Sequence, residues 1–103
     1  MTTVVVLFNL KPGVSAADYE KFARELDIPA VNRLPSVQSF EVLRCEGLMS
    51  GGSAPYQYVE LLRLPDLSKL GPDVQTPAMQ KIVSTFATMA DNPQFIVTTD
   101  LVA

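Results

Sequence analysis

The sequence has no histidine, no tryptophan and a single cysteine, Cys45. Without histidine it lacks the ligands of ordinary zinc and copper sites, and its acidic residues do not cluster as a magnesium site requires. One cysteine also excludes an intrachain disulfide. The glycines Gly47, Gly51 and Gly52 lack the spacing of a phosphate loop or a dinucleotide fingerprint. We therefore expect no metal and no other cofactor.

Basic residues and long apolar runs are also scarce. Eight Lys and Arg face eleven Asp and Glu, which gives a formal net charge of −3. The basic residues are scattered, whereas nucleic-acid binding needs a clustered positive face. No apolar run approaches the roughly 20 residues that cross a bilayer. The start of the chain lacks the basic lead-in and long apolar region of a signal peptide. We expect a cytoplasmic protein without a nucleic-acid or membrane partner.

The chain is long enough for one core. Its 103 residues, of which 48% are hydrophobic, fit a single domain spanning residues 1–103. A chain this short buries only about two-thirds of its unfolded surface, so a large enclosed cavity would need a partner subunit.

Hydrophobic periodicity predicts four strands and two main helices. Ser15 and Thr76 have the residue types and spacing of helix N-caps, and Pro77 suits a first helical position. We expect Tyr19, Phe22, Ala23 and Leu26 to form the apolar face of the first helix, and Pro29 to end or kink that helix near Asp27. The expected elements are strands at 3–10, 36–45, 56–64 and 94–102, helices at 16–27 and 77–90, and short turns at 30–34 and 67–70.

The order strand, helix, strand, strand, helix, strand is that of a ferredoxin-like α+β fold, βαββαβ, with a four-stranded antiparallel sheet. Two helices cover only one face of such a sheet. The first strand is apolar on both faces, because Val4 and Val6 alternate with Val5 and Leu7. The other face therefore needs a cover, and a second copy of the same sheet in a homodimer provides it.

The strand at 56–64 carries the most informative residue, Glu60. A carboxylate between large apolar neighbours is costly to bury, so it should be paired, protonated or chemically active. One interpretation is an ion pair with Arg44 or Arg63. The other is a general base with a raised pKa in a pocket. The register of the strand, which a sequence alone leaves open, decides which sheet face Glu60 occupies.

The chain resembles the dimeric α/β-barrel superfamily over essentially its whole length. The resemblance rests on VVVLFNLKPGVS at 4–15, on LPSV at 34–37 and on TPAM at 76–79. Within the superfamily, DIPAVNRLPSV at 27–37 and the long hairpin are similar to the RedY-like (HapK-like) group. Members of that group occur in bacterial pathways to bipyrroles and bisindoles, where some are implicated in cyclisation without a cofactor.

The resemblance implies a ligand pocket between the sheet and its helices. Stress-responsive and polyketide-cyclase relatives use the first strand, the third strand and the second long helix. The positions that match are Val4, Val6, Phe8, Tyr58, Glu60, Leu62 and Met79. The cyclases place histidines where this chain has Tyr58 and Met79, so any chemistry here must use tyrosines and carboxylates.

Three residues are catalytic candidates: Glu60 as the base, assisted by Tyr58 or Asp27. Tyr58 is equally interpretable as a core aromatic with a satisfied hydroxyl, and Asp27 as a helix end. Asn32 could orient a ligand or simply satisfy its own turn. Phe86, like Met79, would form core or pocket wall.

Two main functions follow. The first is a cofactor-free cyclase or accessory protein of bacterial secondary metabolism that moves a proton on a small apolar aromatic substrate. The second is a non-catalytic ligand-binding or stress-responsive homodimer of the same fold. A cofactor-independent monooxygenase is a third alternative that the fold allows but no residue supports.

Overall fold

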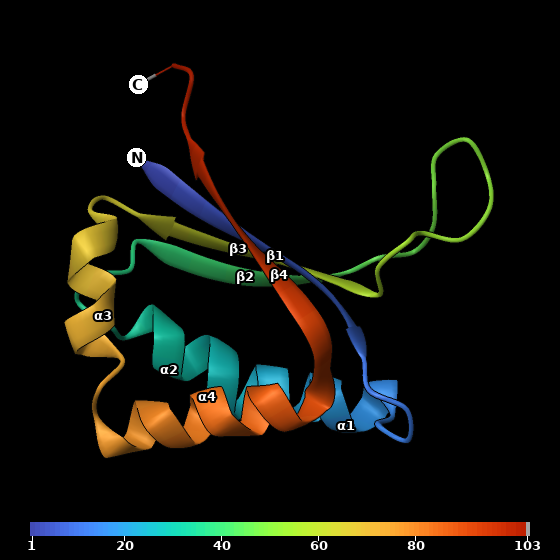
Figure 1. Cartoon of the computed structure of the whole chain (residues 1–103), viewed down its shortest axis with the longest axis horizontal. Helices are drawn as coiled ribbons and strands as arrows, with labels where there is room; N and C mark the ends of the chain where they lie inside the picture. Colours follow the sequence, from blue (N-terminus) through green and yellow to red (C-terminus); the bar gives the residue numbers. More distant parts are fainter. Residues whose placement is uncertain (103) are drawn as a thin grey trace.

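The computed structural model describes residues 1–102 as a four-stranded antiparallel sheet with helices packed on one face (Figure 1). The strands lie in the order β2-β3-β1-β4, which is that of the expected ferredoxin-like fold. The strands are β1 (Thr2–Leu10), β2 (Ser39–Arg44), β3 (Tyr58–Leu64) and β4 (Ala90–Thr99). The two central strands, β1 and β3, are thus paired on both edges.

Two helical segments cover one face of the sheet (Figure 1). The first is a continuous helical segment between β1 and β2, and the second lies between β3 and β4. The helices are α1 (Ala16–Phe22), a π-helical turn (Ala23–Asp27), α2 (Ile28–Asn32), a short 3-10 turn (Leu67–Lys69), α3 (Leu70–Asp73) and α4 (Pro77–Met89). The predicted caps are confirmed: the Ser15 hydroxyl accepts from the Asp18 N–H, and the Thr76 hydroxyl from the Met79 N–H.

The register of the central strands places Glu60 on the helix-covered face. Val6 pairs with Glu60 in the ladder and Val4 pairs with Leu62, and both valines are buried. Because successive side chains point to opposite faces, Val5 and Leu61 lie together on the other face.

Several boundaries differ from the sequence prediction: β2 begins at Ser39 rather than at 36, β4 ends at Thr99 rather than at 102, and two further differences have a visible cause. The first is the start of β3, which lies at Tyr58 rather than at 56. Gln57, in the loop before the strand, is held by Asn9 of β1, whose Oδ1 accepts from the Gln57 N–H at 2.9 Å. The second is the junction of α4 and β4. The helix ends at Met89 and the strand begins at once at Ala90, so the expected loop at 91–93 is part of the strand. A register shift in the β1–β4 ladder and a positive φ of 45° at Asn92 absorb the irregularity there.

The first helical segment also departs from its predicted face. It does not end at Asp27 but continues through Pro29 by way of the π-helical turn. Leu26, expected in the core, is 55% exposed, while Asp27 is only 5% exposed. A π-helical turn closes with an i→i+5 hydrogen bond and so contains one extra residue, which moves every later side chain by one position around the helix. The expectation for Leu26 was therefore wrong.

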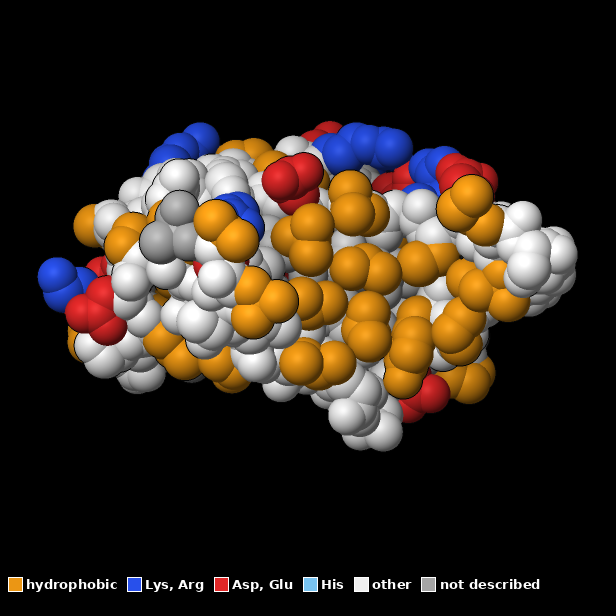
Figure 2. Space-filling model, turned by 90° about the horizontal axis from the view of Figure 1, so that it is seen from above, with side chains coloured by type: hydrophobic (Ala, Val, Ile, Leu, Met, Phe, Trp, Pro, Cys, Tyr) orange, Lys and Arg blue, Asp and Glu red, His pale blue; other side chains and the backbone are white. Residues whose placement is uncertain are grey.

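The other face of the sheet carries no helix. Figure 2, which looks down on this face, shows a continuous apolar area with charged side chains at its margin. Its partly exposed or exposed apolar side chains are Val5, Leu7, Leu43, Val59, Leu61 and Ile96. An apolar sheet face of this extent is typical of a protein interface.

Candidate active site

An aromatic cluster fills the space between β1, β3 and the helices. Tyr19 and Phe8 are fully buried, and their rings meet edge to face at 5.4 Å between centroids. Phe8 also stacks on Tyr58 at 5.6 Å and meets Phe86 edge to face at 5.1 Å. These contacts fix the ring of Tyr19, and with it the direction of its hydroxyl.

The Tyr19 hydroxyl donates a hydrogen bond to Oε2 of Glu60 at 3.2 Å. Glu60 is 5% exposed, and within residues 1–102 it has no cationic partner. The alternative of an ion pair is not found, because Arg44 pairs with Glu20 and Arg63 pairs with Asp100. Burial, reinforced by the nearby Asp27 carboxylate, raises the pKa of Glu60 to about 8, although the Tyr19 hydrogen bond acts in the opposite direction. Glu60 is therefore mainly protonated at neutral pH.

Asp27 lines the same cavity as Glu60 and is equally buried. Burial raises its pKa to about 6. Among residues 1–102, no group donates a hydrogen bond to its carboxylate. Two carboxyl groups whose environments separate their pKa values can act as an acid and a base at the same pH. At neutral pH Asp27 is largely ionised and Glu60 largely protonated.

The cavity between the sheet and the helices has a volume of about 210 Å³. Apart from the two carboxyl groups its wall is apolar, as expected for a small-molecule site. The expected residues that line it are Val4, Val6, Leu62, Met79 and Phe86. The lining also includes Val31, Leu34, Phe40, Leu70, Val74, Ile82, Val83 and Phe95, which the sequence did not single out.

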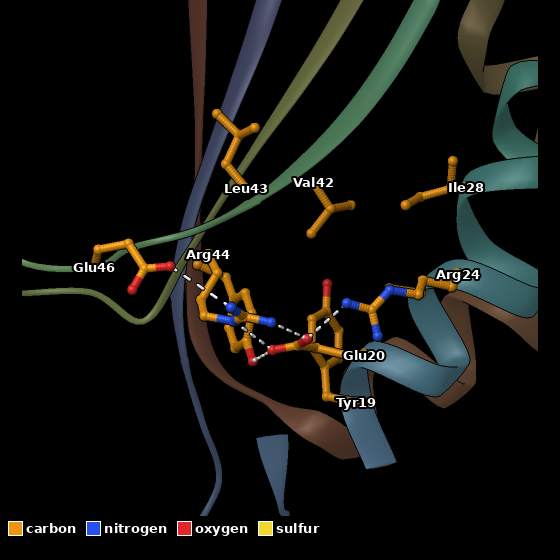
Figure 3. Close-up of a pocket in the computed structure, with 10 residues that line it drawn as sticks. Tyr19, Glu20, Arg24, Ile28, Val42, Leu43, Arg44 and Glu46 are labelled. Carbon is orange, nitrogen blue, oxygen red and sulfur yellow. Dashed lines mark hydrogen bonds and ion pairs between the residues drawn. The ribbon is translucent and has the colours of Figure 1, made fainter. Parts of the chain in front are cut away.

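The structure places Tyr58 away from Glu60. Its ring is buried, but its hydroxyl donates to Oε2 of Glu20 on α1 at 2.7 Å. Figure 3 shows Arg24 and Arg44 converging on the same Glu20 carboxylate. The Arg44 and Tyr58 hydrogen bonds hold the pKa of Glu20 down at about 2. The Tyr58 hydroxyl is thus satisfied by Glu20, and Tyr58 does not line the Glu60 cavity. This agrees with the interpretation of Tyr58 as a core aromatic and not with its role as an assistant to Glu60.

The Glu20 cluster lines a second cavity of about 350 Å³ at the β2 edge. Its polar groups already bind one another, with Arg44 Nε donating to Glu20 at 2.8 Å. The cavity at Glu60 differs, because there the buried Asp27 carboxylate has no hydrogen-bond donor among the described residues. We therefore regard the Glu60 cavity as the candidate active site.

Two other expected binding residues have structural roles. The Asn32 amide donates to the backbone carbonyls of Ile28 and Phe40, and its oxygen accepts from the Phe40 N–H at 3.0 Å. These bonds join α2 to β2 and use the groups that would have oriented a ligand. Phe8 lies beneath the cavity in the aromatic cluster, outside its lining.

Tyr19 is the functional candidate that the sequence analysis missed. The helical pattern placed it on the buried face, which was correct, but gave no sign of what its hydroxyl meets. Burial and the Glu60 and Asp27 carboxylates raise its pKa strongly, so the hydroxyl remains protonated and donates to Glu60. Within residues 1–102, no group of three or more His, Cys, Asp or Glu side chains is arranged to hold a metal ion, and no helix is both long and apolar enough to span a bilayer.

These features define a ferredoxin-like α+β domain with an apolar, carboxylate-bearing cavity under its sheet. Residues 2–101 match the family described as REDY-like protein HapK, and the chain belongs to this family. No curated protein matches the sequence.

Three solved structures show how far the similarity extends. HapK from Hahella chejuensis is 26% identical, with a TM-score of 0.78 over 100% of this chain and 95% of that one. SnoaB, a cofactor-independent oxygenase from Streptomyces nogalater, is 14% identical, with a TM-score of 0.75 over 96% and 91%. A dimeric ferredoxin-like protein of unknown function from Thermobifida fusca is 16% identical, with a TM-score of 0.73 over 96% and 90%. The last two support the fold alone.

Proposed function

We propose that the chain is a cofactor-free acid–base protein of bacterial secondary metabolism, which cyclises a small aromatic substrate of the bipyrrole or bisindole type. The observation that carries the proposal is the pair of buried carboxyl groups, Glu60 and Asp27, in one apolar cavity. Family membership and the description of SnoaB as a cofactor-independent oxygenase support chemistry without a cofactor on this fold.

The substrate class follows from the unpartnered carboxylate. An apolar cavity admits an aromatic ring, and the ionised Asp27 offers an acceptor for a ring N–H donor. Pyrroles and indoles combine an apolar ring with one such N–H. A substrate of this kind would satisfy Asp27 while its ring packs against Val4, Val6 and Met79.

A ring closure that loses water can then be written with the residues present. Glu60 donates its proton to a hydroxyl group of the substrate, which leaves as water while the new ring bond forms at the carbon that carried it. Asp27 accepts the proton that the ring carbon or nitrogen releases. A proton passing back from Asp27 to Glu60 restores both groups, and no electrons are exchanged. Tyr19 stabilises the Glu60 carboxylate that forms during the reaction.

Binding is tested first with indole. Since the chain has no tryptophan, indole fluorescence reports the ligand without a tryptophan background. We expect saturable binding that weakens as pH falls through the Asp27 pKa of about 6 and again as it rises through the Glu60 pKa of about 8. An indole affinity that is independent of pH across this range would contradict the role of Asp27 as the hydrogen-bond acceptor.

Turnover is tested with linear bipyrrole and bisindole precursors, with product followed by mass spectrometry in air and under nitrogen. The Glu60→Gln variant keeps a neutral group of the same shape, so we expect it to bind indole and form no product. Wild-type binding without product favours a non-catalytic ligand-binding protein. Product that requires oxygen favours a monooxygenase.

We also propose that the protein is a homodimer formed by the helix-free face of the sheet. The apolar area that includes Val5, Leu61 and Ile96 supports this arrangement, as does the dimeric T. fusca relative of the same fold. Two such faces packed together bury on the order of 1,000 Å² or more, which is enough for a stable interface.

A further inference from the structure

The π-helical turn between α1 and α2 decides which side chain faces Glu60. It is closed by a hydrogen bond from the Ile28 N–H to the Ala23 carbonyl, five residues earlier. In an undisturbed α-helix with 3.6 residues per turn, Leu26 would lie about 20° from Tyr19 around the helix axis, and Asp27 about 80° away. The extra residue gives Asp27 the inward position that Leu26 would otherwise hold.

The buried positions follow this shifted register. Asp27 is 5% exposed and Leu26 is 55% exposed. One turn later Val31 is buried against Phe40 and Met79, whereas the unshifted register would present Ala30 there. The shift thus gains the packing of Val31, but it also desolvates a carboxylate and leaves a leucine in water.

Stability alone favours the reverse arrangement, with the carboxylate in water and the leucine buried. Burying a carboxylate without a donor is expensive, and exposing a leucine forfeits its burial. Irregular π-helical turns occur frequently at functional sites. The local geometry therefore serves the cavity at the expense of the helix.

Pro29 is the residue that opposes the regular helix. It has no N–H to donate to the carbonyl of Glu25, and its ring would collide with that carbonyl in an α-helical turn. In the wider turn the ring is accommodated as the second residue of α2. Pro29 is half-buried and does not line the cavity, so it can act there only through the helix.

We propose that Pro29 is a positioning residue, which holds the π-helical turn and thereby places Asp27 rather than Leu26 opposite Glu60. The inference rests on the proposed acid–base function for its chemical purpose. The positioning role of Pro29 can be tested without measuring turnover, so a failure of this role can be distinguished from a failure of the proposed reaction.

The test replaces Pro29 by Ala and follows two NMR signals. We expect the Leu26 methyl groups to gain contacts with the Tyr19 ring as the helix relaxes to the α form. As Asp27 moves toward solvent, the titration midpoint of Glu60 should fall by about one pH unit or more, because the neighbouring negative charge is lost. Tyr19 and Asp27 are the titratable groups that face Glu60 and influence its pKa.

A second variant restores the register by another route. Deleting the exposed Glu25 from Pro29→Ala removes the extra residue, so a regular α-helix now carries Asp27 at the inward position. We expect this double variant to fold and to recover the raised Glu60 midpoint, with Leu26 again in solvent. A merely structural role for Pro29 does not predict that recovery.

Unchanged Leu26 contacts and an unchanged Glu60 midpoint in Pro29→Ala overturn the proposal. So does a folded double variant whose midpoint stays low. If Pro29→Ala does not fold, the double variant alone decides between these outcomes. If the shifts occur as expected but the wild type forms no product, the positioning role stands and the proposed reaction falls.

Discussion

The Tyr19 hydroxyl and the Glu60 carboxylate are joined by a buried hydrogen bond between α1 and β3. The bond links residues 41 positions apart in the chain, and it comes from Tyr19 rather than from Tyr58, the tyrosine that the sequence singled out as an assistant to Glu60. A hydroxyl that donates to a carboxylate favours its ionised form. The Tyr19 hydrogen bond therefore keeps the pKa of Glu60 lower than burial alone would make it.

Removal of this hydroxyl gives the first prediction. In Tyr19→Phe the Glu60 carboxylate loses its donor, so its pKa should rise further above about 8. The matched control is Tyr58→Phe, whose hydroxyl contacts Glu20 and should leave the Glu60 titration unchanged. Carbon-13 NMR of the glutamate carboxyl groups measures both variants. Equal shifts in the two variants would mean that Tyr19 has no special relation to Glu60.

A second prediction concerns stability and pH. The pKa of Glu60 is raised from its ordinary value of 4.5 to about 8 in the folded protein. The folded state therefore binds more protons than the unfolded state between these pH values, and the Glu60 contribution to stability is lost as pH rises through them. Glu60→Gln removes this loss. We expect the variant to gain about 5 kcal/mol relative to the wild type at pH 9 and little at pH 4.

Urea denaturation at the two pH values measures the difference. The control is Glu46→Gln, because the Glu46 side chain is 83% exposed and its change should be near zero at both. A Glu60→Gln variant that is less stable than the wild type at pH 9 would show that the carboxylate is favourably held when ionised.

The third prediction separates structure from binding at Asn32. Asn32→Ala removes three hydrogen bonds and leaves the Phe40 backbone N–H without its partner. We expect the free energy of unfolding to fall by about 2 kcal/mol. Indole affinity, measured where the variant is still folded, should stay within about twofold because the amide does not line the cavity. A large loss of affinity with unchanged stability would restore Asn32 as a ligand residue.

A fourth prediction tests the helix-free face. Leu61→Lys places a charge within the apolar area and should convert a dimer into a monomer, since the interface would desolvate the charge. Light scattering after size exclusion measures the mass. Met49→Lys, in the exposed β2–β3 loop, is the control and should remain dimeric. A monomeric wild type would contradict the homodimer itself.

The fold was predictable because local patterns and their order agree. Alternation in the first strand placed Val4 and Val6 opposite Val5, and the caps at Ser15 and Thr76 marked the helix starts correctly. Glu60 was correctly singled out as a carboxylate in an apolar strand. The sequence left its face open, because register is set by pairing with β1 and β2 across long separations.

The site was predictable only in part. Glu60 and Asp27 were both named, but their meeting depends on the π-helical turn, and a regular helical period put Leu26 in its place. Tyr19 and Tyr58 are both buried aromatic residues, and only their directions from α1 and β3 determine which hydroxyl meets Glu60. Side-chain direction of this kind arises from tertiary packing rather than from local pattern.

The long β2–β3 loop, which projects from the body in Figure 1, is anchored at its base rather than along its length. The Cys45 N–H donates to the Gln57 carbonyl at 2.8 Å, and the Gln57 side chain accepts from the Leu10 N–H at 2.6 Å. Residues of the loop beyond these two hydrogen bonds can be added, removed or replaced without shifting Glu60, which lies three residues after Gln57. The loop tip is therefore the natural attachment point for a fluorophore or an affinity tag in work on this protein.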